Sequence, residues 1–402
     1  MSRAVLLIGN YPPPYGGVPR YIENLAPFLA EQGWDVHVLS TGHSGQERHG
    51  RVTVYKLPWW RKVPLVLRHG GSFHGGPLDL RVRTGRDAVT RAWLHLLASV
   101  GREIVRRHDV RVICGFNLSR GGIVGAAIGR ERRLPFVVNN FGELLSNERF
   151  FRENPHVLPF IAATATRLVS GSRHCASTYQ RFGLSPAVQV IPYGVDAARF
   201  RPDTDGEGVR RRVGAAADDV VVLFLGRLNR EMGLDTLLAA APILLDRHRA
   251  IRLVLAGGAG ELSGQAQRYA AGSDGRVAVL ENVPYAELPA LYAAADLVVA
   301  PTAGDRACSS LAAAEALATG RPVVASAVGG IPELVHDGET GALVPPGNPL
   351  ALAESVLRLA ADGECRRALG ARGRRWIEAE WDTRIVLGQM ASVLDEAAGG
   401  RR

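Results

Sequence analysis

The chain has 402 residues, of which 47% are hydrophobic and 22% charged, and its formal net charge is +9 at pH 7. These values fit a globular protein of about two domains and exclude a disordered or fibrous chain. No apolar run reaches the roughly 18 residues of a membrane span, and the first residues, MSRAVLLIGNYPPP, are typical of a strand and turn rather than a signal peptide. We therefore expect a cytoplasmic protein. Its four cysteines lack CxxC spacing, which argues against a zinc site or a disulfide framework.

Short β-rich segments alternate with longer helical segments along the whole chain. The expected strands of the first half are 4–8, 36–40, 52–56, 112–114, 136–139 and 167–170, and those of the second half are 220–225, 252–256, 277–280, 297–300 and 322–326. Continuous apolar runs such as VVLFL indicate parallel sheets that are covered by helices on both faces. Two such series predict an α/β fold with two Rossmann-like, doubly wound domains.

The domain boundaries are predicted from clusters of proline and glycine. Prolines and glycines in VIPYGVDAARFRPDTDGEG place the end of the first domain near residue 198. We expect domains at 1–198 and 199–380, followed by a C-terminal helical segment, 381–402, with an amphipathic helix over 381–397. In open parallel sheets ligands bind at the carboxyl ends of the strands, so two domains that face each other would form one deep cleft.

Basic residues gather between Arg51 and Arg91, where nine Arg or Lys residues stand against two Asp residues. The same stretch holds Trp59, Trp60 and Lys62, a combination that suits an anionic membrane surface or an anionic acceptor. The alternative is an ordinary solvated, arginine-rich face. No nucleic-acid-binding motif accompanies this charge. Residues 57–87 within it are expected to form a long loop.

Two strand-to-helix turns carry glycine or arginine. Gly16 and Gly17 follow the first strand and precede a helix, an arrangement that lets backbone approach a phosphate at the positive end of the helix dipole. In the second half, Gly226 and Arg227 follow the strand VVLFL, where an arginine is well placed for a diphosphate. A structural turn and a solvated arginine are the alternatives.

The segment GDRACSSLAAAEALATGRPVVASAVGG carries one lone acid, Glu315, in an alanine-rich helix. Ser309 or Ser310 is expected to cap a helix that starts at Leu311 and stops at Gly320. Free amides at such a helix start favour a phosphate. The pair Gly329-Gly330 after the next strand would let backbone approach the same ligand.

The order of these motifs resembles family 4 retaining glycosyltransferases of the GT-B fold. The resemblance rests on the first glycine pair, PYGVD, GRL, AAADLVVAPT and the composite of ALATGRPVVAS, VGG, PELV, TG and LVPPGNP, and it covers nearly the whole chain. It implies a first domain that binds the acceptor, a second that binds a nucleotide-diphosphate sugar, and a C-terminal helix that crosses back to the first. It also implies transfer of a hexose-type sugar to a hydroxyl of a small-molecule or lipid-linked acceptor, without a metal or other cofactor.

The resemblance implies the following roles. Arg227 and Glu315 would be the catalytic residues. Arg227 would bind the diphosphate and Glu315 would bind the ribose. Donor contacts are expected from Gly16, Gly17, Gly226, Arg230, Ser309, Ser310, Leu311, Gly329 and Gly330. Acceptor contacts are expected from Asn117, Asn140 and Glu143 at strand ends of the first domain.

This sequence departs from the family pattern at several positions. Ala307 replaces the first glutamate of the E-x7-E pair. Met232 replaces a lysine, for which Arg230 could substitute. Phe116 and Phe141 lie at positions where the family commonly has histidines. These changes keep a second hypothesis open, a GT-B protein that is non-catalytic or depends on a partner. A nucleotide-sugar epimerase is a third. An NAD-dependent oxidoreductase is disfavoured because no GxGxxG follows the first strand.

Overall fold

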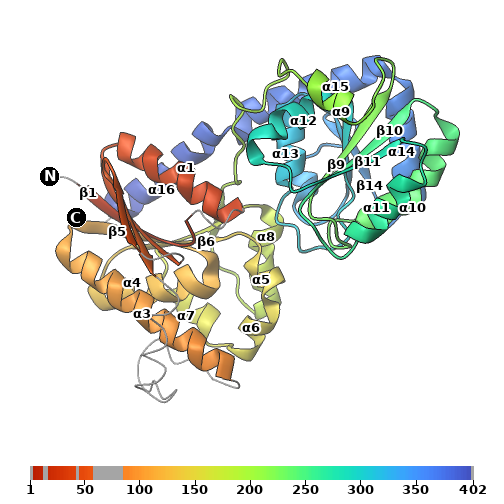
Figure 1. The fold of residues 1–402 in the computed structure, drawn as a ribbon. Helices are drawn as coiled ribbons and strands as arrows, with labels where there is room; N and C mark the ends of the chain where they lie inside the picture. The colour runs from red at the N-terminus through yellow and green to blue at the C-terminus, as the bar shows by residue number, and fades with distance from the viewer. Residues whose placement is uncertain (1–2, 12–16, 42–44, 58–84, 400–402) are drawn as a thin grey trace. The chain divides into compact units, whose positions relative to one another are not determined.

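A computed structural model of the chain describes residues 3–11, 17–41, 45–57 and 85–399. Two compact units emerge: unit 1 comprises Met1–Pro192 and Leu387–Arg402, and unit 2 comprises Tyr193–Val386. Each is a mainly parallel sheet with helices on both faces, which is the predicted α/β architecture (Figure 1).

The described part of unit 1 is built on an eight-stranded sheet of order β3-β4-β2-β1-β5-β6-β7-β8. Its strands are β1 (Arg3–Ile8), β2 (Trp34–Thr41), β3 (Gly45–His49), β4 (Val52–Leu57), β5 (Val110–Phe116), β6 (Phe136–Asn140), β7 (Arg167–Ser170) and β8 (Val188–Val190). All neighbours are parallel except β3 and β4. Both faces of β1 are buried, as its apolar run predicted.

Helices cover the two faces of this sheet (Figure 1). The helices of unit 1 are α1 (Gly17–Glu31), α3 (Gly85–Arg107), α4 (Ile123–Arg132), α5 (Glu143–Ser146), α6 (Glu148–Glu153), α7 (Val157–Thr164), α8 (Arg173–Ser177) and the C-terminal part of α16 (Thr383–Gly399), with a π-helical turn η2 (Asn117–Gly122) and a 3₁₀ turn η3 (Thr178–Phe182). Residues of α3, α4 and α7 form one hydrophobic core with the sheet. The returning helix is tied to unit 1 by two ion pairs, Arg3 with Asp395 and Arg167 with Glu396.

Unit 2 holds a six-stranded parallel sheet of order β11-β10-β9-β12-β13-β14. Its strands are β9 (Val220–Leu225), β10 (Ile251–Gly257), β11 (Val277–Glu281), β12 (Leu297–Ala300), β13 (Val323–Ser326) and β14 (Gly341–Val344). Its helices are α9 (Glu207–Arg212), α10 (Leu234–Arg247), α11 (Ser263–Ala271), α12 (Leu288–Ala294), α13 (Leu311–Ala318), α14 (Pro349–Ala361) and α15 (Gly363–Trp376), with the short turns η4 (Tyr285–Glu287), η5 (Ile331–Glu333) and η6 (Ile377–Trp381). One core packs α10 and α14 against the sheet and another packs α12 and α13 against its other face.

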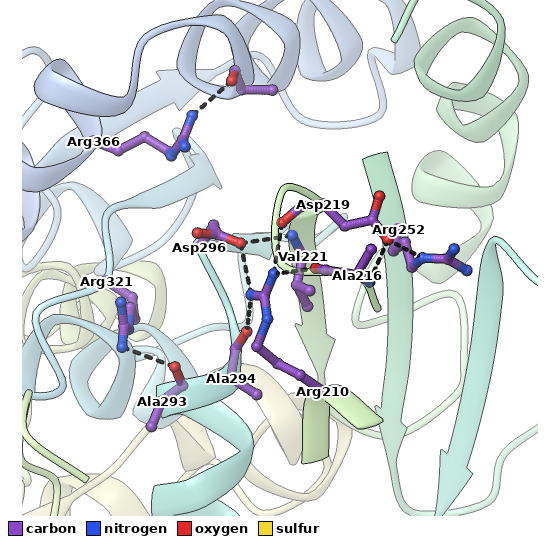
Figure 2. A network of polar contacts seen from close by, with 11 residues as sticks. Arg210, Ala216, Asp219, Val221, Arg252, Ala293, Ala294, Asp296, Arg321 and Arg366 are labelled. Atoms are coloured by element: carbon purple, nitrogen blue, oxygen red, sulfur yellow. Dashed lines mark hydrogen bonds and ion pairs between the residues drawn. The ribbon is translucent and has the colours of Figure 1, made fainter. Parts of the chain in front are cut away.

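An arginine network closes the amino-terminal edge of the second sheet (Figure 2). The Arg210 guanidinium is 3.1 Å from the Asp296 carboxylate and donates to the carbonyl oxygens of Ala294 at 2.9 Å and Asp219 at 2.7 Å. Asp296 also accepts from the backbone N–H of Val221 at 2.8 Å. The network thereby joins α9, the end of α12 and the starts of β9 and β12. It lies at the edge opposite to the carboxyl ends of the strands, so its role is structural.

None of the helices among the described residues is long and apolar enough to cross a membrane. The expected loop 57–87 lies almost entirely outside the described residues, as do Trp59, Trp60, Arg61 and Lys62. The described chain resumes at Gly85, where α3 begins.

Candidate active site

The carboxyl edge of the first sheet holds the predicted acceptor residues. Asn117 follows β5 directly and has a φ of 73°, a left-handed conformation that few residues other than glycine adopt. It opens η2, and Asn140 ends the neighbouring strand β6. Since β5 and β6 are adjacent and parallel, both asparagines lie at the same edge of the sheet.

Glu143 connects these two loops. Its carboxylate accepts the backbone N–H of Leu118 and, at 2.8 Å, the hydroxyl of Ser119. The Asn140 Oδ1 accepts the N–H of Glu143 at 3.2 Å, while its amide nitrogen donates to the Cys175 carbonyl at 3.2 Å. The side chains of Asn140 and Glu143 therefore hold the edge together.

The protonation of Glu143 is perturbed by its surroundings. Burial raises its pKa to about 7, although hydrogen bonds from Ser119 and Leu118 and the nearby charge of Arg120 oppose the shift. Near neutral pH this carboxyl group therefore titrates, unlike an ordinary glutamate.

Aromatic side chains occupy the positions where the family commonly has histidines. Phe116 is fully buried, and its ring centroid lies 5.8 Å from that of Tyr21 and 6.4 Å from that of Phe141. Tyr21 and Phe141 are themselves 5.4 Å apart. This corner of unit 1 is thus an apolar cluster that offers no titratable imidazole. Gly17 is the first residue of α1, and Gly16 lies outside the described residues.

In unit 2, the loop after β9 carries the predicted arginines. Arg227 is exposed and forms no ion pair with any described residue, whereas Arg230 is 3.2 Å from Asp235 and 4.0 Å from Glu261. Met232 packs against the hydrophobic core instead of supplying a cation. Arg227 is therefore the cation of this loop that is available to a ligand.

A second glycine loop lies beside this one. Gly257 ends β10 with a φ of 136°, and a Cβ there would clash with the carbonyl oxygen of Gly226. A Cβ at Gly260 would likewise clash with the carbonyl of Leu228. The backbones of the two loops are therefore in direct contact. The glycine-rich run AGGAGE in the sequence could have indicated this close approach.

Helix α13 begins as predicted. Ser310 is its N-cap and accepts the N–H of Ala313 at 3.2 Å, and Gly320 beyond its end has a φ of 70°. The Ser309 hydroxyl oxygen is buried and has no hydrogen-bond partner in the described part of the chain. Leu311 is 37% exposed at the first turn of the helix.

Glu315 is half-buried, and its carboxylate accepts a hydrogen bond of 2.8 Å from the hydroxyl of Tyr292. Tyr292 is fully buried in α12, and burial together with the neighbouring Glu315 raises its pKa well above the usual value. The Tyr292 hydroxyl therefore stays protonated, and its hydrogen bond holds the Glu315 carboxylate in one orientation. Sequence reasoning missed Tyr292, which contacts Glu315 only through the packing of two helices.

The glycine pair after β13 lies against the loop before α13. Gly329 has a φ of 61°, and a Cβ there would clash with the carbonyl oxygen of Ala307, which accepts the N–H of Gly330 at 2.9 Å. Gly329-Gly330 thus fixes the backbone of Ala307, the residue that replaces the first glutamate. No group of three or more His, Cys, Asp or Glu side chains within the described ranges is arranged to hold a metal ion.

The two Rossmann-like units have the GT-B fold. Sucrose-phosphate synthase from Thermosynechococcus elongatus matches with a TM-score of 0.77 at 22% identity, over 99% of this chain and 100% of that one. Anabaena Alr3699/HepE in complex with UDP matches with a TM-score of 0.76 at 20% identity, over 98% and 100% of the two chains. These likenesses establish the fold.

The chain belongs to glycosyltransferase family 4. Residues 15–199 match the model described as Glycosyltransferase Family 4, and residues 219–362 match the one described as Glycosyl transferases group 1. The protein is therefore a retaining, nucleotide-sugar-dependent glycosyltransferase.

Two named relatives cover most of the chain. The GDP-mannose-dependent alpha-(1-6)-phosphatidylinositol monomannoside mannosyltransferase of Mycolicibacterium smegmatis is 35% identical over 99% of this chain and 98% of its own length. The D-inositol 3-phosphate glycosyltransferase of Segniliparus rotundus is 30% identical over 89% of this chain and 80% of its own length.

Proposed function

We propose that the protein transfers mannose from GDP-mannose to a hydroxyl of an inositol-containing, lipid-linked acceptor. The observation that carries this proposal is the 35% identity, over nearly the whole of both chains, to an enzyme named for that donor and for a phosphatidylinositol mannoside acceptor. The inositol 3-phosphate enzyme supports an inositol-containing acceptor independently.

Arg227 is proposed to bind the diphosphate of the donor. It is exposed and free of carboxylate partners among the described residues, and a guanidinium is suited to two phosphate oxygens. Glu315, whose orientation is fixed by Tyr292, is proposed to accept hydrogen bonds from the ribose. The remaining proposed donor contacts are Gly16, Gly17, Gly226, Arg230, Ser309, Ser310, Leu311, Gly329 and Gly330.

The chemistry needs little more than charge stabilisation. As the bond between the anomeric carbon and the diphosphate oxygen breaks, the acceptor oxygen bonds to the same face of that carbon. The acceptor proton passes to the departing diphosphate. Negative charge builds up on the diphosphate, where Arg227 and the amide groups that open α13 would stabilise it. Ala307 supplies no carboxylate, so no covalent glycosyl-enzyme is invoked.

The acceptor is proposed to bind unit 1, at the edge formed by Asn117, Asn140 and Glu143, and the donor to bind unit 2. Because the carboxylate of Glu143 is already occupied by Leu118 and Ser119, its contribution would be to shape the loop around the acceptor. A lipid-linked acceptor also fits a cytoplasmic protein in peripheral contact with an anionic membrane, which the basic stretch 51–91 would provide.

The first experiment is a thermal-shift panel with GDP, UDP, ADP and TDP, followed by transfer assays with GDP-mannose and phosphatidylinositol monomannoside. A nucleotide at a hundred times its dissociation constant stabilises by about 2.7 kcal/mol. We expect GDP to raise the melting temperature. We expect Arg227→Ala to abolish both this increase and the transfer of mannose. Arg268→Ala, which removes another exposed arginine of unit 2, is the matched control.

The same panel separates the rival hypothesis, which the replacements Ala307, Met232 and Phe116 motivate. A non-catalytic or partner-dependent protein would give no transfer with any donor tested. A shift with UDP alone would contradict the choice of GDP-mannose while leaving the donor site intact.

A further inference from the structure

A cavity of about 700 Å³ opens in unit 1 at the edge opposite to the proposed acceptor site. It is lined by the starts of β1, β2 and β4, by the exposed strand β3 and by the last turns of α3. Asn117 follows the carboxyl end of β5 and Asn140 ends β6, whereas His108 and Asp109 in the cavity wall precede the amino end of β5. A site here is therefore separate from the proposed chemistry, and its volume is in the range of small-molecule pockets.

The cavity wall includes a hydrogen-bonded trio of aromatic side chains. The Tyr55 hydroxyl lies 3.2 Å from His37 Nδ1 and 3.3 Å from His108 Nε2, and the two imidazole centroids are 4.0 Å apart. One hydroxyl proton can serve only one of these nitrogens, so the other imidazole donates to the hydroxyl oxygen. The two ring nitrogens that do not contact Tyr55 are left to hydrogen-bond a hydroxylated ligand.

His37 is held in the neutral form. It is only 5% exposed, and burial together with the neighbouring His108 lowers its pKa to about 4. The positive charge of the cavity therefore comes from arginines rather than from this histidine.

Three arginines, Arg48, Arg51 and Arg107, line the cavity alongside three carboxylates. The carboxylates already have guanidinium partners: Asp35 pairs with Arg51 at 2.9 Å, Glu103 with Arg106 and Arg107 at 2.7 and 2.6 Å, and Asp109 with Arg111 at 2.7 Å. Arg48 donates to the backbone carbonyl of Gly50 at 3.2 Å and forms no ion pair within the described residues. Each lining carboxylate is thus paired with a guanidinium group, and Arg48 is the lining arginine that has no carboxylate partner among the described residues.

Arg48 and Arg107 both act on the Tyr55 hydroxyl. Burial raises the pKa of Tyr55, and the two nearby guanidinium groups oppose that rise. Both arginines line the same cavity as the histidine–tyrosine trio, so an anion in the cavity lies near their positive charges.

We propose that this cavity binds a small organic phosphate, with Arg48 and Arg107 on the phosphate group and the His37–Tyr55–His108 trio on hydroxyls of its organic part. A phosphate ion alone would fill a small part of the volume, and the aliphatic side chains of Val100 and Ile104 also line the cavity. The proposal adds a second ligand site to the glycosyltransferase and does not depend on the identity of its donor or acceptor.

The test is calorimetric titration of the full-length protein with glucose 6-phosphate and, separately, with inorganic phosphate, in the presence of saturating GDP. The nucleotide fills the donor site, and the ring signals of His37 and His108 together with the Arg48 variant distinguish binding in the cavity from binding at the proposed acceptor site. We expect saturable binding of the sugar phosphate, with changes in the ¹⁵N signals of the His37 and His108 rings. Arg48→Ala should weaken it roughly tenfold or more, since it removes a charge-assisted contact.

Two further variants make the result decisive. Tyr55→Phe removes the central hydroxyl and should also weaken binding, while Arg149→Ala, at an arginine whose side chain is 90% exposed, should leave it unchanged. No heat and no histidine response at millimolar sugar phosphate would overturn the proposal, as would undiminished binding by Arg48→Ala. Equal affinity for inorganic phosphate would overturn the assignment of an organic ligand.

Discussion

Replacing Glu143 by glutamine should change how the stability of the protein depends on pH. The Glu143 pKa is raised from 4.5 to about 7 by burial, so the folded state binds a proton more tightly than the unfolded state does. Such a group stabilises the fold fully below pH 4.5, and this contribution is lost as the pH rises through 7. A shift of that size corresponds to about 3 kcal/mol, at roughly 1.4 kcal/mol per pKa unit.

Glutamine preserves the hydrogen bonds without the titration. Its side-chain oxygen accepts the N–H of Leu118, and its amide group donates to the Ser119 hydroxyl, which rotates to accept. We therefore expect Glu143→Gln to match the wild type near pH 4.5 and to exceed its free energy of unfolding by up to about 3 kcal/mol at pH 8. Glu143→Ala removes both acceptors, so we expect it to be less stable than Glu143→Gln at every pH.

Denaturant unfolding from pH 4 to 8, followed by circular dichroism, measures these differences. Glu153→Gln is the matched control, because it removes a carboxylate that is 38% exposed and paired with Arg149 on the surface of the same unit. If the wild type and Glu143→Gln unfold with parallel pH profiles, the carboxyl group of Glu143 does not titrate in this range and the argument fails.

Three further substitutions test other parts of the structure. Arg210→Ala should destabilise unit 2 by about 2 kcal/mol or more, measured by denaturant unfolding, because it removes charge-assisted hydrogen bonds to the Ala294 and Asp219 carbonyls and leaves the partly buried Asp296 without its cation (Figure 2). A loss below 1 kcal/mol would contradict this. Gly329→Ala should displace the backbone of Ala307 and weaken GDP binding in calorimetry, and unchanged affinity would show that the loop tolerates a Cβ. Tyr292→Phe removes the hydroxyl that orients Glu315, so we expect a higher KM for the donor with little change in kcat, and an unchanged KM would argue against a ribose contact by that carboxylate.

The strands were predictable because their sequences are continuous apolar runs. The expected strands 167–170, 220–225 and 297–300 coincide with β7, β9 and β12, and every other expected strand overlaps an observed one. The strand β3, with the sequence GQERH, was not predicted, since every residue in it is exposed and it pairs antiparallel at the sheet edge. The strands β8 and β14 are short and were missed as well.

The site was predictable where it depends on local chemistry. The cap at Ser310 and the turn at Gly320 follow from residue type and spacing. The partner of Glu315 did not follow, because it is set by the packing of α12 on α13, and no local pattern encodes that. In the same way, the acceptors and donors around Glu143 depend on the pairing of β5 with β6 and on the path of the chain beyond them. The roles of these residues in binding remain predictions.

The path of the chain has a consequence for biosynthesis. Unit 1 is discontinuous, since its last segment, Leu387–Arg402, follows the whole of unit 2. Leu387, Met390 and Leu394 are almost completely buried in the finished protein. At a synthesis rate of about 5–20 residues per second, roughly 200 intervening residues delay their arrival by about 10–40 s. During that interval unit 1 lacks the segment Leu387–Arg402, and the apolar surface that this segment covers in the finished protein stays exposed. Unit 2 lies later in the sequence, yet it is the first unit whose residues are all synthesised.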